Sequence, residues 1–505
     1  MKRLFLLILV VGISFPMFSQ PALKREFRGA WIHVIGQNQY QNMSTQAMKQ
    51  YFIDLLDSLQ ALHVNAIIFQ VRPAADAFYY SEIEPWSRYL TGTQGQAPGG
   101  NFDPMAFLIQ EAHKRVMEFH AWLNPYRVKA SENEVLCDSH LYFRYPERFI
   151  KYGSQLFFDP GLPENRNWIC RVVKDILNRY DVDAIHMDDY FYPYPIAGEK
   201  FHDENSFRYY APKQGFSPNQ INDWRRDNVN LLIEQIKHTI VLTKPWVRFG
   251  ISPFGIYRNK KNTPEGSGSN TSGLQNYDDL YADILLWMQK GWIDYCVPQI
   301  YWEIGNPAAD YDTLIRWWSS NRSKNNQLYI GQDVERTMKA SDLQWKGQNQ
   351  LPRKMQLART LPGIDGNCWW TGYALVKNIG GAGDSLRNHY QAYPALIPAY
   401  THLHKKTPKD VKSLKAEWTS KGYCLHWKPN GDPQNPEKAQ YYVIYRFNNG
   451  EKTRLDDPSK IVILTKETAF LLPYENGTMK YKYVVTSVDR FHNETKKGKS
   501  KKVKL

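Results

Sequence analysis

The chain has 505 residues, of which 23% are charged and 42% are hydrophobic, so neither a disordered nor a membrane-embedded protein is expected. This length exceeds one ordinary hydrophobic core and predicts at least two domains. The formal net charge of +14 is concentrated near the C-terminus, because residues 402–505 hold 22 lysines and arginines against 11 acidic residues.

The N-terminus predicts export. Lys2 and Arg3 precede a run of 12 apolar residues from Leu4 to Phe15, and a cleavage point follows at Ser19 or Gln20. This pattern is typical of a secretory signal peptide, and the run is too short to span a membrane. We therefore assign the first 20 residues to a signal peptide and expect a soluble protein, periplasmic or extracellular, without a membrane span.

Short apolar runs then alternate with amphipathic stretches. Nearly continuous apolar runs are typical of parallel strands that are buried on both faces. Helix signals lie between them: Ser44 or Thr45 can cap one helix, and Asp103 with Pro104 opens another. Eight such units predict a (β/α)8 barrel over residues 21–398, with its active site at the carboxyl ends of the strands. The runs are 27–34, 65–72, 118–126, 183–191, 248–256, 294–302, 328–334 and 366–375.

The pattern changes after Pro398. Strand-like runs separated by turn signals such as Asn449-Gly450 continue to the end, without a helix signal. Residues 399–505 therefore predict a small all-β sandwich, with Trp427 as a core anchor. The predicted strands are 423–429, 440–447, 460–465, 468–473 and 480–490.

Three acids occupy places that are typical of catalysis in such a barrel. Asp188 and Asp189 end the fourth predicted strand, and Glu303 follows the sixth. Adjacent strand residues point to opposite sides, so one aspartate should face the site and the other should position or tune it. We take all three acids as candidate catalytic residues. The alternative for each is a loop cap or a salt bridge.

The predicted mouth of the barrel also collects rings, amides and further charged groups. Aromatic faces suit sugar rings, while amides and charged groups suit hydroxyls. The alternative is that these side chains pack the upper layer of the barrel. The candidate substrate-binding residues are Arg72, Asp76, Trp122, Asn124, Tyr126, His186, Tyr190, Tyr192, Tyr301, Trp302 and Trp370.

No metal and no cofactor are expected. The strand histidines His33, His120 and His186 have no neighbour at metal-ligand spacing, so structural roles are favoured. The chain has no GxGxxG, Walker or GxSxG motif in the required context.

Several motifs together resemble the glycosyl hydrolase-like 10 family of bacterial envelope proteins. Examples are REFRGAWI (25–32), HAWLNPYR (120–127), YDVDAIHMDDYFYPYP (180–195) and PQIYW (298–302), and the resemblance covers residues 25 to 395. It implies a TIM barrel that is often followed by a fibronectin-III-like module. It also implies hydrolysis of glycosidic bonds, with peptidoglycan glycan strands that lack stem peptides as the substrate.

Glycoside hydrolysis needs a protonated carboxyl group and either a nucleophile or a positioned water. Repulsion between Asp188 and Asp189, together with the aromatic surroundings, should raise one pKa, so one of the two is the predicted general acid. Glu303 is the candidate nucleophile or base, and Asp333 or Glu335 after the seventh strand is the alternative.

A third possibility follows from a looser resemblance to chitinase-type barrels in DVDAIHMDDY and QIYW. There the substrate's own 2-acetamido group is the nucleophile. Asp188 and Asp189 would then divide the orienting and acid roles, Tyr301 would assist, and Glu303 would only bind.

Other functions stay open. The barrel can act on another polysaccharide, dietary or from a host, or bind carbohydrate without cleaving it. The basic C-terminal region can favour an anionic envelope surface, although a solvated lysine-rich face is the simpler interpretation. Nucleic acid is not an expected partner, because export is predicted and the lysines are confined to this region.

Overall fold

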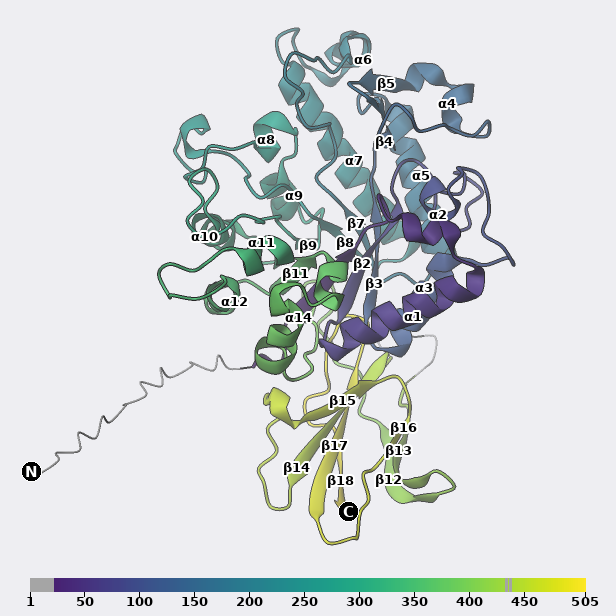
Figure 1. The fold of residues 1–505 in the computed structure, drawn as a ribbon, viewed down its shortest axis with the longest axis vertical. Coiled ribbons are helices and arrows are strands. Elements are labelled where there is room, and N and C mark those ends of the chain that lie inside the picture. Colours follow the sequence, from purple (N-terminus) through teal and green to yellow (C-terminus); the bar gives the residue numbers. More distant parts are fainter. Residues whose placement is uncertain (1–21, 432–434, 436–437) are drawn as a thin grey trace, which may run out of the picture.

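A computed structural model describes residues 22–431, 435 and 438–505, and the predicted signal peptide lies outside them. Eight parallel strands form a closed barrel in which each strand pairs with its neighbour in the chain and the last pairs with the first (Figure 1). The predicted barrel is therefore confirmed. Its strands are β1 (Phe27–Ile32), β2 (Ala66–Arg72), β3 (Glu118–Leu123), β7 (Ala184–Met187), β8 (Arg248–Ile251), β9 (Tyr295–Cys296), β10 (Gln327–Asp333) and β11 (Gly366–Trp370).

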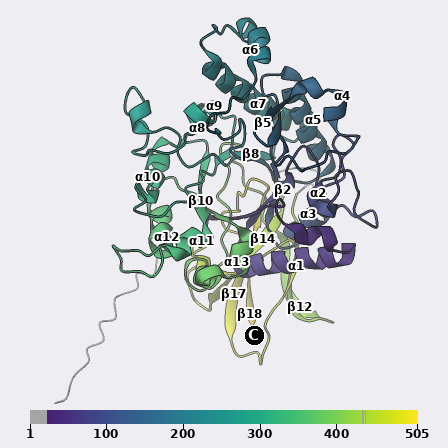
Figure 2. The same ribbon diagram turned by 45° about the horizontal axis from the view of Figure 1, so that its top comes forward.

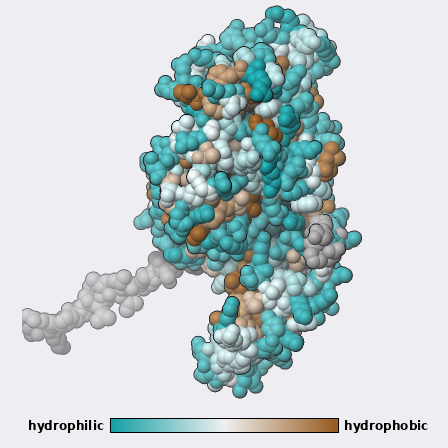
Figure 3. All heavy atoms as spheres, turned by 90° about the vertical axis from the view of Figure 1, so that its right-hand side faces the viewer, coloured by the Kyte–Doolittle hydropathy of each residue, from teal (hydrophilic) through white to brown (hydrophobic). Residues whose placement is uncertain are grey.

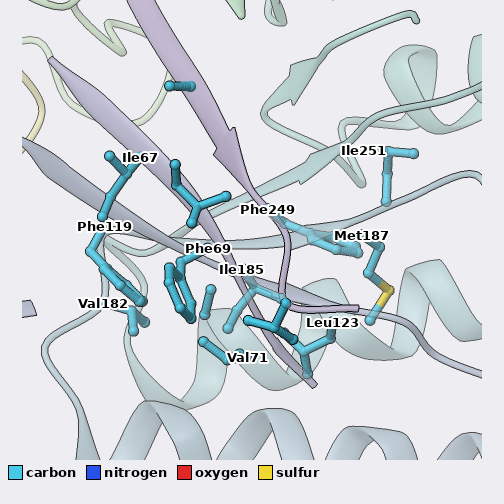
Figure 4. Close-up of a cluster of buried hydrophobic side chains, with 14 of the residues drawn as sticks. Ile67, Phe69, Val71, Phe119, Leu123, Val182, Ile185, Met187, Phe249 and Ile251 are labelled. Atoms are coloured by element: carbon cyan, nitrogen blue, oxygen red, sulfur yellow. The ribbon is translucent and has the colours of Figure 1, made fainter. Parts of the chain in front are cut away.

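The barrel strands bury both faces, as their continuous apolar sequences predict. In β2, Ile67 and Phe69 point outward and join a cluster that includes helix side chains, whereas Ala66 and Ile68 belong to a second cluster. Figure 4 shows the outer cluster, with side chains from β2, β3, β7 and β8 gathered together. The second cluster fills the barrel interior with residues such as Phe27, so the barrel is a packed core and not a pore.

The helices surround the barrel (Figure 2). The predicted caps are confirmed: Ser44 accepts from the backbone N of Ala47 (3.2 Å), and Asp103 accepts from Ala106 N (3.0 Å). The main helices are α1 (Thr45–Ala61), α3 (Pro104–Lys114), α5 (Pro163–Arg179), α7 (Ile221–Thr243), α9 (Ile284–Lys290), α10 (Tyr311–Asn321), α12 (Leu351–Thr360) and α13 (Gly372–Val376). Shorter helices lie in the connections: α2 (Arg88–Thr91), α4 (Leu141–Arg144), α6 (Glu204–Tyr210), α8 (Asn276–Asp279), α11 (Val334–Lys339) and α14 (Ala382–Ser385).

The connection after β3 carries a small antiparallel sheet of β4 (Arg127–Lys129), β5 (Phe149–Tyr152) and β6 (Gln155–Phe158). In Figure 1 this sheet and α4 lie at the end of the barrel away from the C-terminal strands. The two ends of the barrel are therefore covered differently.

The C-terminal strands form two antiparallel sheets. One holds β12 (Lys412–Thr419), β13 (Gly422–Lys428) and β16 (Ala469–Leu471), and the other holds β15 (Ile461–Thr465), β14 (Tyr441–Asn448), β17 (Lys480–Val488) and β18 (Lys499–Lys504). As expected, Trp427 is buried in the core between them. The fibronectin-III-like character and the domain boundary at 398 stay predictions.

These sheets contact the amino-terminal end of the barrel through buried polar groups. Glu118, the first residue of β3, binds the Arg248 guanidinium and accepts from His492 Nε2 (2.6 Å). At the edge of the contact, Arg490 pairs with Asp181 at 2.9 Å.

The molecular surface on the face seen in Figure 3 is mostly hydrophilic, with separate apolar patches. Within the described ranges, we find no helix whose length and apolar character would let it cross a membrane.

Candidate active site

A cavity of about 310 Å³ lies where the barrel strands end. Asp188 and Tyr190 follow β7, Ser252 follows β8, and Gln299 comes shortly after β9. The cavity is lined by Trp31, Trp122, Asp188, Tyr190, Tyr194, Ser252, Phe254, Gln299, Tyr301, Trp302, Arg336 and Trp370.

Asp188 presents a carboxyl group to this cavity. The residue is 8% exposed, and its Oδ1 accepts from Gln299 Nε2 (2.7 Å) and from the backbone N of Asp189 (2.9 Å). Gln299 also donates to the carbonyl oxygen of Ser252 (2.9 Å), so the amide that orients Asp188 is itself fixed. Burial raises the pKa of Asp188, and the two hydrogen bonds oppose that rise.

Asp189 lies behind Asp188 and does not line the cavity. It is 1% exposed, and its Oδ2 accepts from the Tyr194 hydroxyl at 2.5 Å. Burial, followed by the negative charge of Asp188, raises the pKa of Asp189 well above its usual range. Two buried carboxyl groups of this kind retain a shared proton at pH values where an exposed aspartate has lost its own.

Aromatic rings enclose the cavity. Tyr301 is stacked on Trp370 at a centroid separation of 6.5 Å and meets Trp31 edge-on at 6.3 Å, and Trp122 meets Trp370 at 6.3 Å. Burial, and then the charge of Asp188, raise the pKa of Tyr301 well above its usual range. The phenol of Tyr301 is therefore protonated at neutral pH and can donate a hydrogen bond.

The predicted substrate-binding residues separate into two groups. Five of them line the cavity: Trp122, Tyr190, Tyr301, Trp302 and Trp370. The other six are buried or nearly buried outside it: Arg72, Asp76, Asn124, Tyr126, His186 and Tyr192.

Three members of the second group bind other parts of the protein. Arg72 forms two 2.6 Å hydrogen bonds to Glu84, and Asn124 donates to the carbonyl oxygen of Pro73 (2.8 Å). His186 lies under the cavity, where its Nδ1 is 3.1 Å from the Tyr295 hydroxyl. We therefore leave this group out of the substrate contacts proposed below.

The second predicted carboxylate also lies outside the cavity lining. Glu303 is half-buried after β9, and its charge acts on Lys354. Asp333, the alternative, caps α11 by accepting from the backbone N of Arg336 (2.8 Å). Glu335, the other alternative, is exposed and does not line the cavity. The catalytic roles of these acids stay predictions.

Six lining residues were not among the candidates: Trp31, Tyr194, Ser252, Phe254, Gln299 and Arg336. Most could have been found from their position in or just after a barrel strand: Trp31 lies in the first apolar run, and Ser252 lies just past the short strand β8. Gln299 lies three residues past the end of β9. Arg336 lies within a helix, α11, so strand ends gave no pointer to it.

Histidines offer no metal centre in the described residues, where no group of three or more His, Cys, Asp or Glu side chains is arranged to hold an ion. His120, for example, is bonded to the Tyr295 hydroxyl (2.8 Å) and to Glu118 (2.9 Å).

Comparison with known proteins gives three findings. Glycosyl hydrolase YngK of Bacillus subtilis is 42% identical over 505 residues, covering 98% of this chain and 97% of the relative. Glycosyl hydrolase DigH of Escherichia coli K12 is 35% identical over 374 residues, covering 69% of this chain and 82% of the relative. The PgaB (BpsB) glycoside hydrolase domain of Bordetella bronchiseptica aligns with a TM-score of 0.48 at 11% identity, over 72% of this chain and 99% of that domain.

The sequence model of the glycosyl hydrolase-like 10 family matches residues 26–346, which hold most of the barrel and most of the cavity lining. The match to YngK extends beyond this region and includes the C-terminal sheets. The chain therefore belongs to the glycosyl hydrolase-like 10 family and is an enzyme of the glycoside hydrolase class.

Proposed function

We propose that this enzyme hydrolyses O-glycosidic bonds in a bacterial envelope glycan, namely peptidoglycan strands that lack stem peptides. The observation that carries the proposal is Asp188, a carboxyl group with a raised pKa in a cavity walled by aromatic rings. Export belongs to the same proposal and rests on the signal-peptide pattern of the first 20 residues.

In this proposal Asp188 is the general acid. It gives its proton to the glycosidic oxygen while the bond from that oxygen to the anomeric carbon breaks. Asp189 is a positioning residue that shares the proton of the pair, because the burial of Asp189 and then the charge of Asp188 raise its pKa. Water then adds to the anomeric carbon, its hydroxyl group stays there, and its proton restores the pair.

For the nucleophile we propose the 2-acetamido group of the sugar, whose carbonyl oxygen bonds to the anomeric carbon as the glycosidic oxygen departs. Water then displaces that oxygen from the anomeric carbon, which restores the acetamide. Two features support this choice over Glu303: the cavity lining contains Tyr301 as a protonated donor beside Asp188, and it does not contain Glu303. The Tyr301 hydroxyl would donate to the acetamide carbonyl and hold it under the anomeric carbon. A two-carboxylate reaction through Glu303 is the alternative that the experiment below separates.

The test is digestion of amidase-treated peptidoglycan strands by the wild type and by the variants Asp188→Asn, Asp189→Asn and Glu303→Gln, with the products identified by mass spectrometry. We expect cleavage by the wild type, loss of about 10²–10⁴-fold in Asp188→Asn, and an active Glu303→Gln. Loss of activity in Glu303→Gln as well would favour the two-carboxylate reaction. A wild type that binds the strands without cleaving them would contradict the proposed function.

A further inference from the structure

The cavity contains a charged group that the proposed reaction does not use. Arg336 is an exposed residue of α11 that lines the same cavity as Asp188, and these two are the charged residues among the lining side chains. Within the described ranges, its guanidinium has no carboxylate partner at salt-bridge distance. An unpaired cation at the wall of a binding cavity is a site for an anionic group of the ligand.

The nearest acid along the chain is already engaged. The Oδ1 of Asp333 accepts the backbone N–H of Arg336 as the cap of α11. The positive charge of Arg336 acts on Asp333 without an ion pair between the two side chains. The guanidinium is thus left to solvent or to a ligand.

The helix that carries Arg336 is tied to the backbone of the aromatic wall. The buried Lys354 donates from its Nζ to the carbonyl oxygen of Trp302 (2.9 Å) and to the hydroxyl of Thr337 (3.1 Å). Thr337 is the next residue after Arg336, and Trp302 is part of the cavity wall, where it meets Phe254 edge-on at 5.3 Å. One lysine therefore ties the backbone at Trp302 to the residue that follows Arg336 in α11.

We propose that Arg336 binds a carboxylate carried by a sugar of the substrate, and that this contact selects strands whose carboxyl group is free. A guanidinium pairs with a carboxylate through two parallel hydrogen bonds, which gives both affinity and orientation. The proposal rests on the proposed function and deepens it. In peptidoglycan the stem peptide is joined to the lactyl carboxyl group of the sugar by an amide bond, so strands without peptides carry the anion that Arg336 would bind.

The experiment compares two probes: amidase-treated peptidoglycan strands, and the same strands after reduction of their carboxyl groups to alcohols. Binding is measured by isothermal titration calorimetry with the full chain carrying Asp188→Asn to prevent turnover, and cleavage is measured with the otherwise unaltered chain. Each measurement is repeated with Arg336→Gln and Arg336→Lys. Lys339→Gln is the matched control, because Lys339 is an exposed cation of the same helix that does not line the cavity.

We expect Arg336→Gln to weaken binding of the carboxylate strands by about tenfold or more and to leave binding of the reduced strands unchanged. Arg336→Lys should recover part of the loss, and Lys339→Gln should change neither. Equal effects of Arg336→Gln on both probes, or no difference between the probes while Arg336 is intact, would overturn the inference. Selective binding without cleavage would contradict the proposed function alone, and cleavage without selectivity would contradict Arg336 alone.

Discussion

Asp188 and Asp189 are neighbours in the chain, yet they meet different surroundings. Asp188 faces the cavity and is oriented by Gln299, whereas Asp189 is enclosed and bonded to Tyr194. Burial raises the pKa of both, and the charge of Asp188 adds to the rise at Asp189. A strand end produces this division simply because successive side chains point to opposite sides.

Asp188 and Asp189 together should determine the pH at which kcat/KM falls on the alkaline side. A general acid works while protonated, so its raised pKa extends activity to higher pH, and activity falls as pH rises through that pKa. Asp189→Asn removes the like-charge repulsion, so the alkaline limb of kcat/KM should move to lower pH by about one unit or more.

Tyr194→Phe should shift the alkaline limb of kcat/KM in the opposite direction. It removes a hydrogen bond that favours the charged form of Asp189, so the alkaline limb should move to higher pH. The measurement is kcat/KM between pH 4 and 9 for both variants. Shifts in the same direction for the two variants would contradict the shared-proton description.

Site residues were predictable where their role depends on position along a strand. The strand-end rule led to Asp188, Tyr301 and Trp370, all of which line the cavity. It also led to Arg72, which instead forms hydrogen bonds to Glu84, a residue twelve positions later in an irregular loop. No periodicity in the sequence reports that pairing, because it depends on how the loop folds back over β2.

At the scale of elements, Lys354 joins three segments. From α12 it reaches Trp302 after β9 and Thr337 on α11, and burial lowers the pKa of its ammonium group to about 7. In the unfolded chain the same lysine titrates near its ordinary value, about 10.4. The folded state therefore binds fewer protons between these two values.

It follows that stability should rise with pH across this window. The free energy of unfolding loses nothing to the protonation of Lys354 above about pH 10. As pH falls from 10 toward 7, protonation of this lysine in the unfolded chain lowers the free energy of unfolding by up to about 1.4 kcal/mol per pH unit. Lys354→Met should flatten the pH dependence of the free energy of unfolding between pH 7 and 9.5, and the exposed Lys339→Met should not. Urea unfolding at several pH values makes the comparison, and equal slopes in all three proteins would contradict it.

The elements themselves were predictable to different degrees. Seven barrel strands fall within the predicted apolar runs, and β10 begins at Gln327, one residue before its run; β9 spans only Tyr295–Cys296. The strands β12 and β18 were not predicted, because they are lysine-rich edge strands with few inward side chains. In β18, Val503 alone is buried. Lysines on an edge strand discourage pairing with other chains, and in the sequence such a strand resembles a basic tail.

At the scale of the whole molecule, the cavity lies where the barrel strands end, whereas the C-terminal region contacts Glu118 and Arg248, which begin β3 and β8. Glu118 is the centre of the contact: despite its burial, the charges of Arg248 and His492 hold its pKa well below the usual range. We expect the contact to serve stability, because Glu118 does not line the cavity.

Glu118→Gln should lower the free energy of unfolding by about 3 kcal/mol, because it leaves the buried Arg248 without a counter-charge. The rate on glycan strands at 25 °C should be unchanged. Arg490→Gln is the control, since its ion pair with Asp181 is partly exposed to solvent and should contribute less than about 1 kcal/mol. Thermal unfolding measures both, and equal destabilisation by the two variants would count against a central role for Glu118.

The central claim is that Asp188 gives a proton to the departing glycosidic oxygen. Its most direct test asks whether the loss of kcat/KM in Asp188→Asn depends on the leaving group of the substrate. The values of kcat/KM are compared for glycan strands and for an aryl glycoside of the same sugar whose phenol leaves without protonation. We predict a loss of about 10²–10⁴-fold on the strands and of less than about tenfold on the aryl glycoside. Equal losses on both substrates would show that Asp188 is not the acid.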